Sequence, residues 1–208
     1  MDVPPSIDDA FNRLSGLMGQ DLRQLAAKYG VTVFKDGKLN KGWVGQVVER
    51  ILGFKLSSLQ APNGVDWELK VVSLREKNGA WEPKETMQIT MISSSAALCA
   101  DFKDSFLYHK LRRMLVCGRE FAGPAEPRAR LISVVKFDIL EPQNSELLKM
   151  VEADYHLVRN TIAQNGFDAL TGRMGILVQP RTKGPGHGSR SRAFYARRVQ
   201  FVARILGL

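Results

Sequence analysis

The chain has 208 residues, of which 44% are hydrophobic and 25% are charged. These proportions are typical of a folded domain with a substantial core, and they exclude wholesale disorder. No apolar run approaches the roughly 18 residues that span a bilayer, and the first residues lack the pattern of a signal peptide. We therefore expect a cytoplasmic protein without membrane contact, in which the two cysteines, Cys99 and Cys117, are free thiols.

The net charge of +9 is concentrated at one end of the chain. Residues 172–208 hold eight basic side chains and no acidic one, whereas the rest of the chain holds 22 basic and 21 acidic residues. Such asymmetry indicates a polyanionic partner, and a solvated basic face is the alternative. Glycines interleave with the charges in Lys183-Gly184-Pro185-Gly186-His187-Gly188.

Helices are predicted in the first quarter of the chain. Residues 6–29 read as two short helices, and Ser6 is expected to cap the first of them. Residues 40–53 form a third helix, with Asn40 as its cap and Gly53 at its end.

Strand patterns begin at residue 65. Residues 65–74 alternate, so that Trp67, Leu69 and Val71 share one face, and a hairpin turn follows at Lys77-Asn78-Gly79. The later expected elements are strands at 86–92, 114–116, 130–140, 175–179 and 192–197, and helices at 104–112, 145–165 and 199–206. This order predicts a single α/β or α+β domain over residues 1–208, with a mixed central sheet flanked by helices.

The strand at 65–74 carries the candidate reaction centre. Residues two apart share a face of a strand, so Asp66, Glu68 and Lys70 are expected to point the same way. Carboxylates and a backbone carbonyl supply hard oxygen ligands for Mg²⁺, which activates water and neutralises phosphate charge. A lysine beside them orients or deprotonates that water, or stabilises developing charge. The pattern therefore favours metal-dependent phosphodiester hydrolysis.

Glu-x-Lys alone is a weak signal. Glu82-Pro83-Lys84 also fits it, and we interpret that copy as a surface loop. The competing interpretation of Glu68 and Lys70 is an ion pair on an exposed strand face.

The preceding helix adds context. Its sequence Lys41-Gly42-Trp43-Val44-Gly45-Gln46-Val47-Val48-Glu49 resembles the Gly-Trp-Ile-Gly…Glu signature of the MutH-type endonucleases. Further blocks resemble that family in the same order: Leu14-Ser15-Gly16, Gly64-Val65…Glu68-Leu69-Lys70, Glu85-Thr86, His109-Lys110-Leu111 and Phe194-Tyr195. The resemblance implies a restriction-endonuclease-like core in two lobes around a DNA cleft. Residues 1–120 would be mainly catalytic, and residues 121–208 would mainly recognise DNA.

The same resemblance implies roles for residues around the strand. Glu68 would be a metal ligand, with the Leu69 carbonyl beside it, and Lys70 would be the catalytic lysine. Glu49 would be an additional acid near the metal, and Lys110 an active-site lysine near the phosphate. The implied cofactor is Mg²⁺, for which Mn²⁺ or Ca²⁺ would substitute in binding.

Other residues are expected to contact double-stranded DNA. The resemblance places Arg181 and Lys183 in a major-groove recognition loop, and Tyr195 on the base-reading side. Position in the basic segment adds further candidates, since arginine reads guanine and any cation attracts phosphate. These are His187, Arg190, Arg192 and, near the third helix, Lys41.

One departure concerns the metal site. The family places an aspartate before its Glu-x-Lys, often just after a proline, but here Asn63 follows Pro62. An amide is a poorer Mg²⁺ ligand and does not neutralise the cation's charge. Three interpretations are open: Asn63 is an inactivating replacement, Asp66 has taken over as ligand, or the protein is naturally impaired.

The function that we expect first is that of a type II restriction enzyme, a Mg²⁺-dependent endonuclease that cuts a short duplex site as a monomer or homodimer. The second candidate is a mismatch-repair nicking enzyme that depends on a partner ATPase. A third is a DNA-binding relative with an impaired nuclease core. Each would act in the cytoplasm, at the bacterial nucleoid.

Overall fold

A computed structural model describes residues 4–54, 62–93, 101–184 and 191–208. Cys99, His187 and Arg190 therefore lie outside the described residues. The described chain forms two compact units. The first runs to Lys84 and adds Met114–Phe137, and the second comprises Glu85–Arg113 and Asp138–Gly207. These boundaries differ from a single division at residue 120, and the expected split into catalytic and recognition lobes stays a prediction.

The first unit contains the three helices expected from the sequence, α1 (Ile7–Ser15), α2 (Leu22–Lys28) and α3 (Trp43–Ile51). Ser6 caps α1 as predicted, because its Oγ accepts a hydrogen bond from the Asp9 N–H at 3.1 Å. The prediction that Asn40 caps α3 is wrong. Gly42 occupies the cap position, and Asn40 Oδ1 instead accepts from the Gly42 N–H at 3.2 Å.

A mixed sheet forms the centre of the first unit, as the sequence predicted. Its order is β4-β3-β6-β7, and the strands are β3 (Glu68–Lys77), β4 (Ala80–Pro83), β6 (Arg113–Glu120) and β7 (Leu131–Asp138). β3 runs parallel to β6, with Glu68 opposite Met114, and antiparallel to β4. A separate two-stranded ribbon is made by β1 (Phe34–Lys35) and β2 (Lys38–Leu39).

The hairpin between β3 and β4 has the expected turn, with Asn78 at φ 52° and Gly79 at φ 78°. The interpretation of Glu82-Pro83-Lys84 as a surface loop is wrong for its first two residues, which lie in β4. Glu82 faces Arg75 across the hairpin and forms an ion pair with it at 2.6 Å. This second Glu-x-Lys is therefore part of an edge strand.

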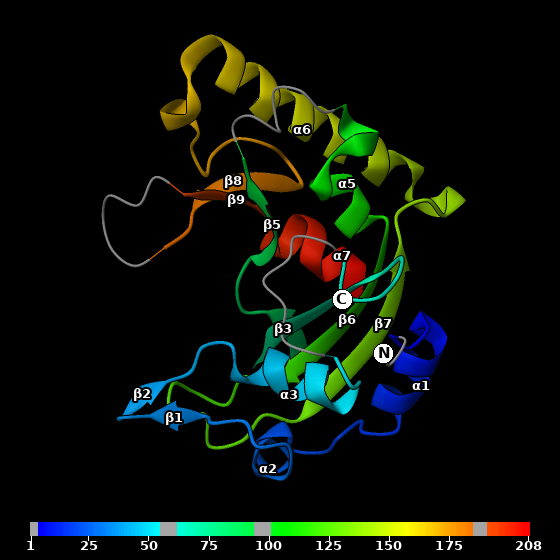
Figure 1. Ribbon diagram of the computed structural model, residues 1–208, viewed down its shortest axis with the longest axis vertical. Coiled ribbons are helices and arrows are strands. Elements are labelled where there is room, and N and C mark those ends of the chain that lie inside the picture. Colours follow the sequence, from blue (N-terminus) through cyan, green and yellow to red (C-terminus); the bar gives the residue numbers. More distant parts are fainter. Residues whose placement is uncertain (1–3, 55–61, 94–100, 185–190) are drawn as a thin grey trace. The chain divides into compact units, whose positions relative to one another are not determined.

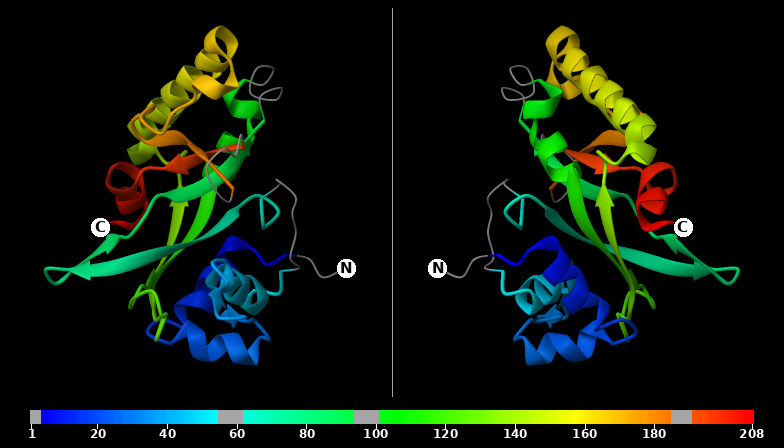
Figure 2. Two further views of the ribbon diagram at one scale, coloured as in Figure 1. Left: turned by 90° about the vertical axis from the view of Figure 1, so that its left-hand side faces the viewer. Right: turned by 90° about the vertical axis from the view of Figure 1, so that its right-hand side faces the viewer.

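The three helices and the sheet share one core, and Figure 2 shows the helices packed on one side of the sheet. Its largest fully buried side chains include Trp43 of α3 and Trp67 just before β3. Burial also raises the pKa of the Cys117 thiol on β6 to about 12, so this free cysteine is an inert core residue.

The second unit is built on an antiparallel sheet of order β5-β9-β8. Its strands are β5 (Met87–Ile92), β8 (Val178–Thr182) and β9 (Arg192–Ala196). Its helices are α5 (Phe106–Leu111), α6 (Ser145–Asn165) and α7 (Ala203–Leu206), and its short helical turns are η1 (Phe102–Asp104), η2 (Pro142–Asn144), η3 (Phe167–Ala169) and the π-helical η4 (Arg198–Val202). In the part of the chain that the structure describes, no helix is long and apolar enough to cross a membrane.

Several predicted elements of this unit are confirmed, and α6 has the predicted bounds. The strand expected at 175–179 instead begins at Val178. The reason is that the backbone N–H groups just before it bond to the Asp154 carboxylate and not to a neighbouring strand. The closing helix expected at 199–206 is π-helical in its first half.

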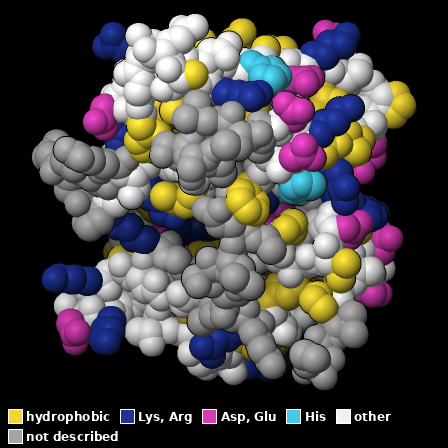
Figure 3. All heavy atoms as spheres, turned by 45° about the horizontal axis from the view of Figure 1, so that its top comes forward, with side chains coloured by type: hydrophobic (Ala, Val, Ile, Leu, Met, Phe, Trp, Pro, Cys, Tyr) yellow, Lys and Arg dark blue, Asp and Glu magenta, His cyan; other side chains and the backbone are white. Residues whose placement is uncertain are grey.

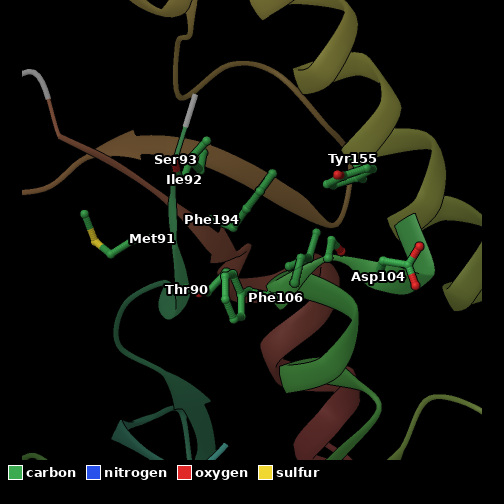
Figure 4. A pocket seen from close by; sticks show the side chains of 10 residues that line it. Thr90, Met91, Ile92, Ser93, Asp104, Phe106, Tyr155 and Phe194 are labelled. Carbon is green, nitrogen blue, oxygen red and sulfur yellow. The ribbon is translucent and has the colours of Figure 1, made fainter. Parts of the chain in front are cut away.

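The inner face of α6 meets the sheet around a small pocket of about 70 Å³ (Figure 4). Tyr155 of α6 and Phe194 of β9 both line it, with ring centroids 6.2 Å apart. Residues 90–92 of β5, Ser93 and residues 104–107 complete the lining. The pocket therefore lies where α6 packs against the sheet of β5, β9 and β8.

An ion-pair network closes the end of β6. Glu120, whose side chain is 6% exposed, accepts hydrogen bonds from Arg128 Nε at 2.9 Å and Arg130 Nε at 2.8 Å. These hydrogen bonds lower the pKa of Glu120 to about 2, and the bond from Arg128 is the larger cause. Next to it, Arg119 forms a two-pronged ion pair with Glu126.

The low pKa of Glu120 predicts an acid dependence of stability. A carboxylate whose pKa is lower in the folded protein than its ordinary 4.5 stabilises the fold above pH 4.5, and that contribution is lost as the pH falls from 4.5 to about 2. Glu120→Gln should therefore reduce the loss of stability across this window, as measured by urea unfolding at a series of pH values. Glu146→Gln, at an exposed ion pair of α6, is the control. An unchanged acid dependence in Glu120→Gln would contradict the assignment.

Candidate active site

Glu68 and Lys70 lie side by side at the start of β3. Lys70 Nζ is 2.6 Å from Glu68 Oε1, as expected for neighbours on one strand face. The Glu68 side chain is 2% exposed and that of Lys70 is 18% exposed. The competing interpretation as an exposed surface ion pair is therefore wrong. A buried carboxylate needs charge or hydrogen-bond partners, and Lys70 is one of them.

A bend before β3 supplies a further partner for Glu68. The Asn63 backbone N–H donates to Glu68 Oε2 at 3.3 Å, and Asn63 Oδ1 accepts from the Leu69 N–H at 3.1 Å. The Gly64 N–H closes the bend by donating to the Trp67 carbonyl at 2.9 Å. Asn63 thus folds back over the start of the strand. This hydrogen-bonding role could not be predicted from the sequence, in which Asn63 stands out only as a missing acidic ligand.

Gly64 is required by close packing within the bend. A Cβ atom added there would lie 2.1 Å from Nε1 of the Trp67 indole. The indole is fixed, because its Nε1–H donates to the Pro5 carbonyl at 3.1 Å and its ring lies 5.6 Å from that of Phe54. The bend, and with it Asn63, therefore rests on a buried tryptophan.

Glu49 reaches the same place from α3. Asn63 Nδ2 lies 3.5 Å from Glu49 Oε1, at the limit of a hydrogen bond. Burial raises the pKa of Glu49, the charge of Glu68 raises it further, and Lys70 and Asn63 act in the opposite direction. The structure thus brings together Glu49, Asn63, Glu68 and Lys70, from a helix, a bend and a strand.

Three other candidate residues are placed differently. Asp66 lies in the bend before β3, so the alternation expected to align it with Glu68 does not reach it. Lys41 is exposed just before α3. Lys110 is a buried residue of α5 in the second unit, and its role near a phosphate stays a prediction.

The side-chain oxygens of Glu49, Glu68 and Asn63 suit a divalent cation, with the Asn63 amide as the weakest ligand. Glu49 and Glu68 provide carboxylate oxygens, the hard ligands that Mg²⁺ prefers. Their mutual repulsion, seen in the raised pKa of Glu49, is what a bound cation would relieve. Within residues 4–54, 62–93, 101–184 and 191–208, no group of three Asp, Glu, His or Cys side chains is arranged to hold a metal. The amide of Asn63 stands where a third acid would complete such a group.

Arg181, a candidate for contacting base edges, has defined contacts in the basic hairpin of β8 and β9. Arg181 Nη1 donates to Thr86 Oγ1 at 2.7 Å, and its guanidinium lies 5.5 Å from the centre of the Tyr195 ring. Burial raises the pKa of Tyr195. Lys183 is exposed just after β8, and Arg192 begins β9. This contact of Thr86 was not predicted, because the residue stands out in the sequence only as part of a block that resembles the family.

Comparison with known proteins supports the family suggested by the sequence. Residues 56–150 match the family model described as the DNA mismatch repair enzyme MutH. A DNA mismatch repair protein MutH from Shewanella sp. (strain MR-7) is 31% identical over 189 residues, which cover 87% of this chain and 80% of that protein. The protein of the same name from Shewanella putrefaciens is 30% identical over 186 residues, with the same coverage.

Among solved structures, a complex of the restriction endonuclease MvaI with its cognate DNA substrate aligns over 92% of this chain and 94% of its own. The TM-score is 0.39 and the identity 11%, so this alignment carries no argument. The sequence relatives decide the assignment, and the chain belongs to the MutH family of endonucleases.

The raised pKa of Glu49 gives a direct test of the site's geometry. Glu68→Gln removes the nearby negative charge, so the pKa of Glu49 should fall toward its ordinary value of 4.5. The measurement is an NMR pH titration of the Glu49 carboxyl carbon. Glu76→Gln, at an exposed position of the same strand, should leave that pKa unchanged. An unchanged pKa of Glu49 in the Glu68→Gln variant would show that the two carboxylates do not interact.

Proposed function

We propose that this chain is a Mg²⁺-dependent, sequence-specific endonuclease of double-stranded DNA. The observation that carries the proposal is the convergence of Glu49, Glu68 and Lys70 around Asn63 in a member of the MutH family. The acid-free basic hairpin that presents Arg181 supports a duplex as the substrate.

The side chains divide the chemistry between them. A bound Mg²⁺ would lower the pKa of a water molecule and neutralise charge on the scissile phosphate. Glu68 and Glu49 would hold the cation, with the Leu69 carbonyl as a further oxygen. Lys70 is held by Glu68, and its ammonium can orient the attacking water or donate to a phosphate oxygen.

The proposed function has three possible forms, which experiments can distinguish. Type II restriction is the form expected from the sequence, and it requires only the protein and Mg²⁺. Mismatch-repair nicking with a partner ATPase is favoured by the names of the relatives, which are DNA mismatch repair proteins. An impaired, DNA-binding form is favoured by the amide at Asn63, which leaves the metal site with two carboxylates.

Asn63→Asp should raise Mg²⁺-dependent cleavage by orders of magnitude. The new carboxylate would complete the acidic site, and its Oδ1 can still accept from the Leu69 N–H. The measurement is digestion of a sequenced plasmid by both forms, followed by mapping of the ends. Equal activity of the two forms would contradict the metal-ligand role of position 63.

The same digestion separates the three forms of the function. Robust double-strand cleavage by the pure Asn63→Asp protein supports restriction. Nicking that requires an added repair ATPase supports the repair form. Tight, salt-dependent binding without cleavage under any metal supports the impaired form. Asp66→Ala is the control, because it abolishes activity only if Asp66 has replaced the missing ligand.

Arg181→Ala should relax specificity at one base pair and weaken binding to the preferred site by about 1–3 kcal/mol. The reason is that Thr86 and Tyr195 hold the Arg181 guanidinium in place, which is the condition for reading a base edge. Lys183→Ala is the comparison: relaxed specificity at another base pair would make Lys183 a second base-reading residue, and an equal loss for all duplexes would make it a phosphate contact. Binding measured on single-base variants of the mapped site distinguishes the two. A uniform loss for Arg181→Ala would instead make Arg181 a phosphate contact.

A further inference from the structure

A short segment before β8 is bonded from both sides by charged side chains. On one side is Asp154 of α6, which is 4% exposed. Its Oδ1 accepts from the Ile176 N–H at 2.7 Å, and its Oδ2 accepts from the N–H groups of Leu177 at 2.7 Å and Val178 at 2.9 Å. Consecutive backbone N–H groups that converge in this way form a concave anion site, and here the anion is a side chain of the same protein.

The other side of the segment is held by Arg197, which directly follows β9. Its guanidinium donates to the carbonyls of Gly175 at 3.0 Å, Met174 at 3.1 Å and Gly172 at 3.2 Å. Its backbone N–H donates to the Leu177 carbonyl at 2.8 Å. The backbone polar groups of residues 172–178 are thus bonded to α6 on one side and to the end of β9 on the other.

Gly175 makes this arrangement possible. It has φ +76°, and an added Cβ would lie 1.9 Å from the Val178 carbonyl and 3.1 Å from Cγ of Asp154. The closeness of the Asp154 carboxylate to the backbone therefore depends on a residue without a side chain.

The clamped segment leads directly into the strand that carries Arg181. β8 is an edge strand, paired only with β9, and it contains Pro180, which has no N–H to donate. Its five residues pair with β9 along one side, so a single ladder holds the strand in the sheet. Its entry point, three residues before Arg181, is fixed in addition by Asp154 and Arg197.

We propose that Asp154 is a positioning residue for DNA recognition, which sets where β8 presents Arg181 to the duplex. The inference rests on the proposed function for its DNA-binding part. Asp154 does not touch DNA in this scheme. It acts through the backbone of residues 176–178, so its loss should reduce discrimination between sequences and leave sequence-independent attraction intact.

Asp154→Asn tests the proposal with a nearly isosteric change. The amide keeps one acceptor oxygen, but its NH₂ group would face a backbone N–H, so at least one of the bonds is lost. The matched control is Glu152→Gln on the same helix. Glu152 lies in an acidic surface hollow with Asp101, Asp104 and His156, and Figure 3 shows acidic side chains beside a histidine.

Two measurements are needed. The first is hydrogen exchange of the backbone amides in the DNA-free protein, where Asp154→Asn should speed exchange at residues 176–182 and Glu152→Gln should not. The second is binding to a duplex selected from a random-sequence pool by the parent protein, compared with a scrambled duplex. Asp154→Asn should reduce the affinity ratio about tenfold by weakening the selected duplex alone, since one base contact contributes about that much.

The outcomes are distinguishable. Unchanged exchange at residues 176–182 would show that Asp154 does not hold the strand. Faster exchange with an unchanged affinity ratio would show that the strand's position does not set specificity. If the parent protein selects no sequence from the pool, the proposed sequence-specific function is wrong. The hydrogen-exchange result then tests whether Asp154 holds the segment before β8. Should Asp154→Asn not fold, Arg197→Lys loosens the segment from the other side and should change both measurements in the same direction.

Discussion

Burial of the Glu68 carboxylate is the constraint around which the candidate active site is built. Taking a charged carboxylate out of water is costly unless it is paired and hydrogen-bonded. Lys70 supplies the charge and the Asn63 N–H supplies a hydrogen bond, but only if the chain bends back at residues 63–66. That bend needs Gly64, because the Trp67 indole occupies the space beside it. One buried charge therefore determines the conformation of its whole approach segment, and its repulsion adds to burial in raising the pKa of Glu49 on α3.

Buried carboxylates recur in this protein with different partners and different consequences. Glu120 is paired with two partly exposed arginines, and its lowered pKa makes it a source of stability above acid pH. Asp154 is satisfied by backbone N–H groups, so it determines the position of a segment. Glu68 shares its surroundings with a second carboxylate, Glu49, whose pKa is raised first by burial and then by the charge of Glu68. The kind of partner thus separates groups that support the fold from the group suited to chemistry.

Much of the fold follows from hydrophobic periodicity, and the exceptions have a common cause. The periodicity places α1, α3, α6 and β9 within a few residues of their observed positions, since each buries one regular face. The errors occur where side chains bond to the backbone. Asn40 turns the chain before α3, and Asp154 captures the N–H groups that would have begun β8 three residues earlier. Such bonds depend on individual polar side chains, and hydrophobic periodicity carries no information about them.

The candidate site shows the same limit. Glu68 and Lys70 could be paired from strand alternation, but Asp66 could not, because the strand begins after it. The convergence of Glu49 depended on the family resemblance, since a helix and a strand meet only through tertiary packing. The hydrogen-bonding role of Asn63 could be recognised only from the structure. Its amide accepts from the Leu69 N–H and donates toward Glu49, so it satisfies two neighbours at once.

Asn63 therefore exchanges one property for another. An aspartate at this position would keep the bond from the Leu69 N–H but would place a third negative charge beside Glu49 and Glu68. In the absence of a cation, that charge would be repelled by both carboxylates and would oppose the bend. The asparagine removes the repulsion and adds a donor toward Glu49, which stabilises the metal-free fold. In the proposed function, an asparagine at position 63 also withholds a carboxylate ligand from Mg²⁺, as expected where stability and activity depend on the same charges.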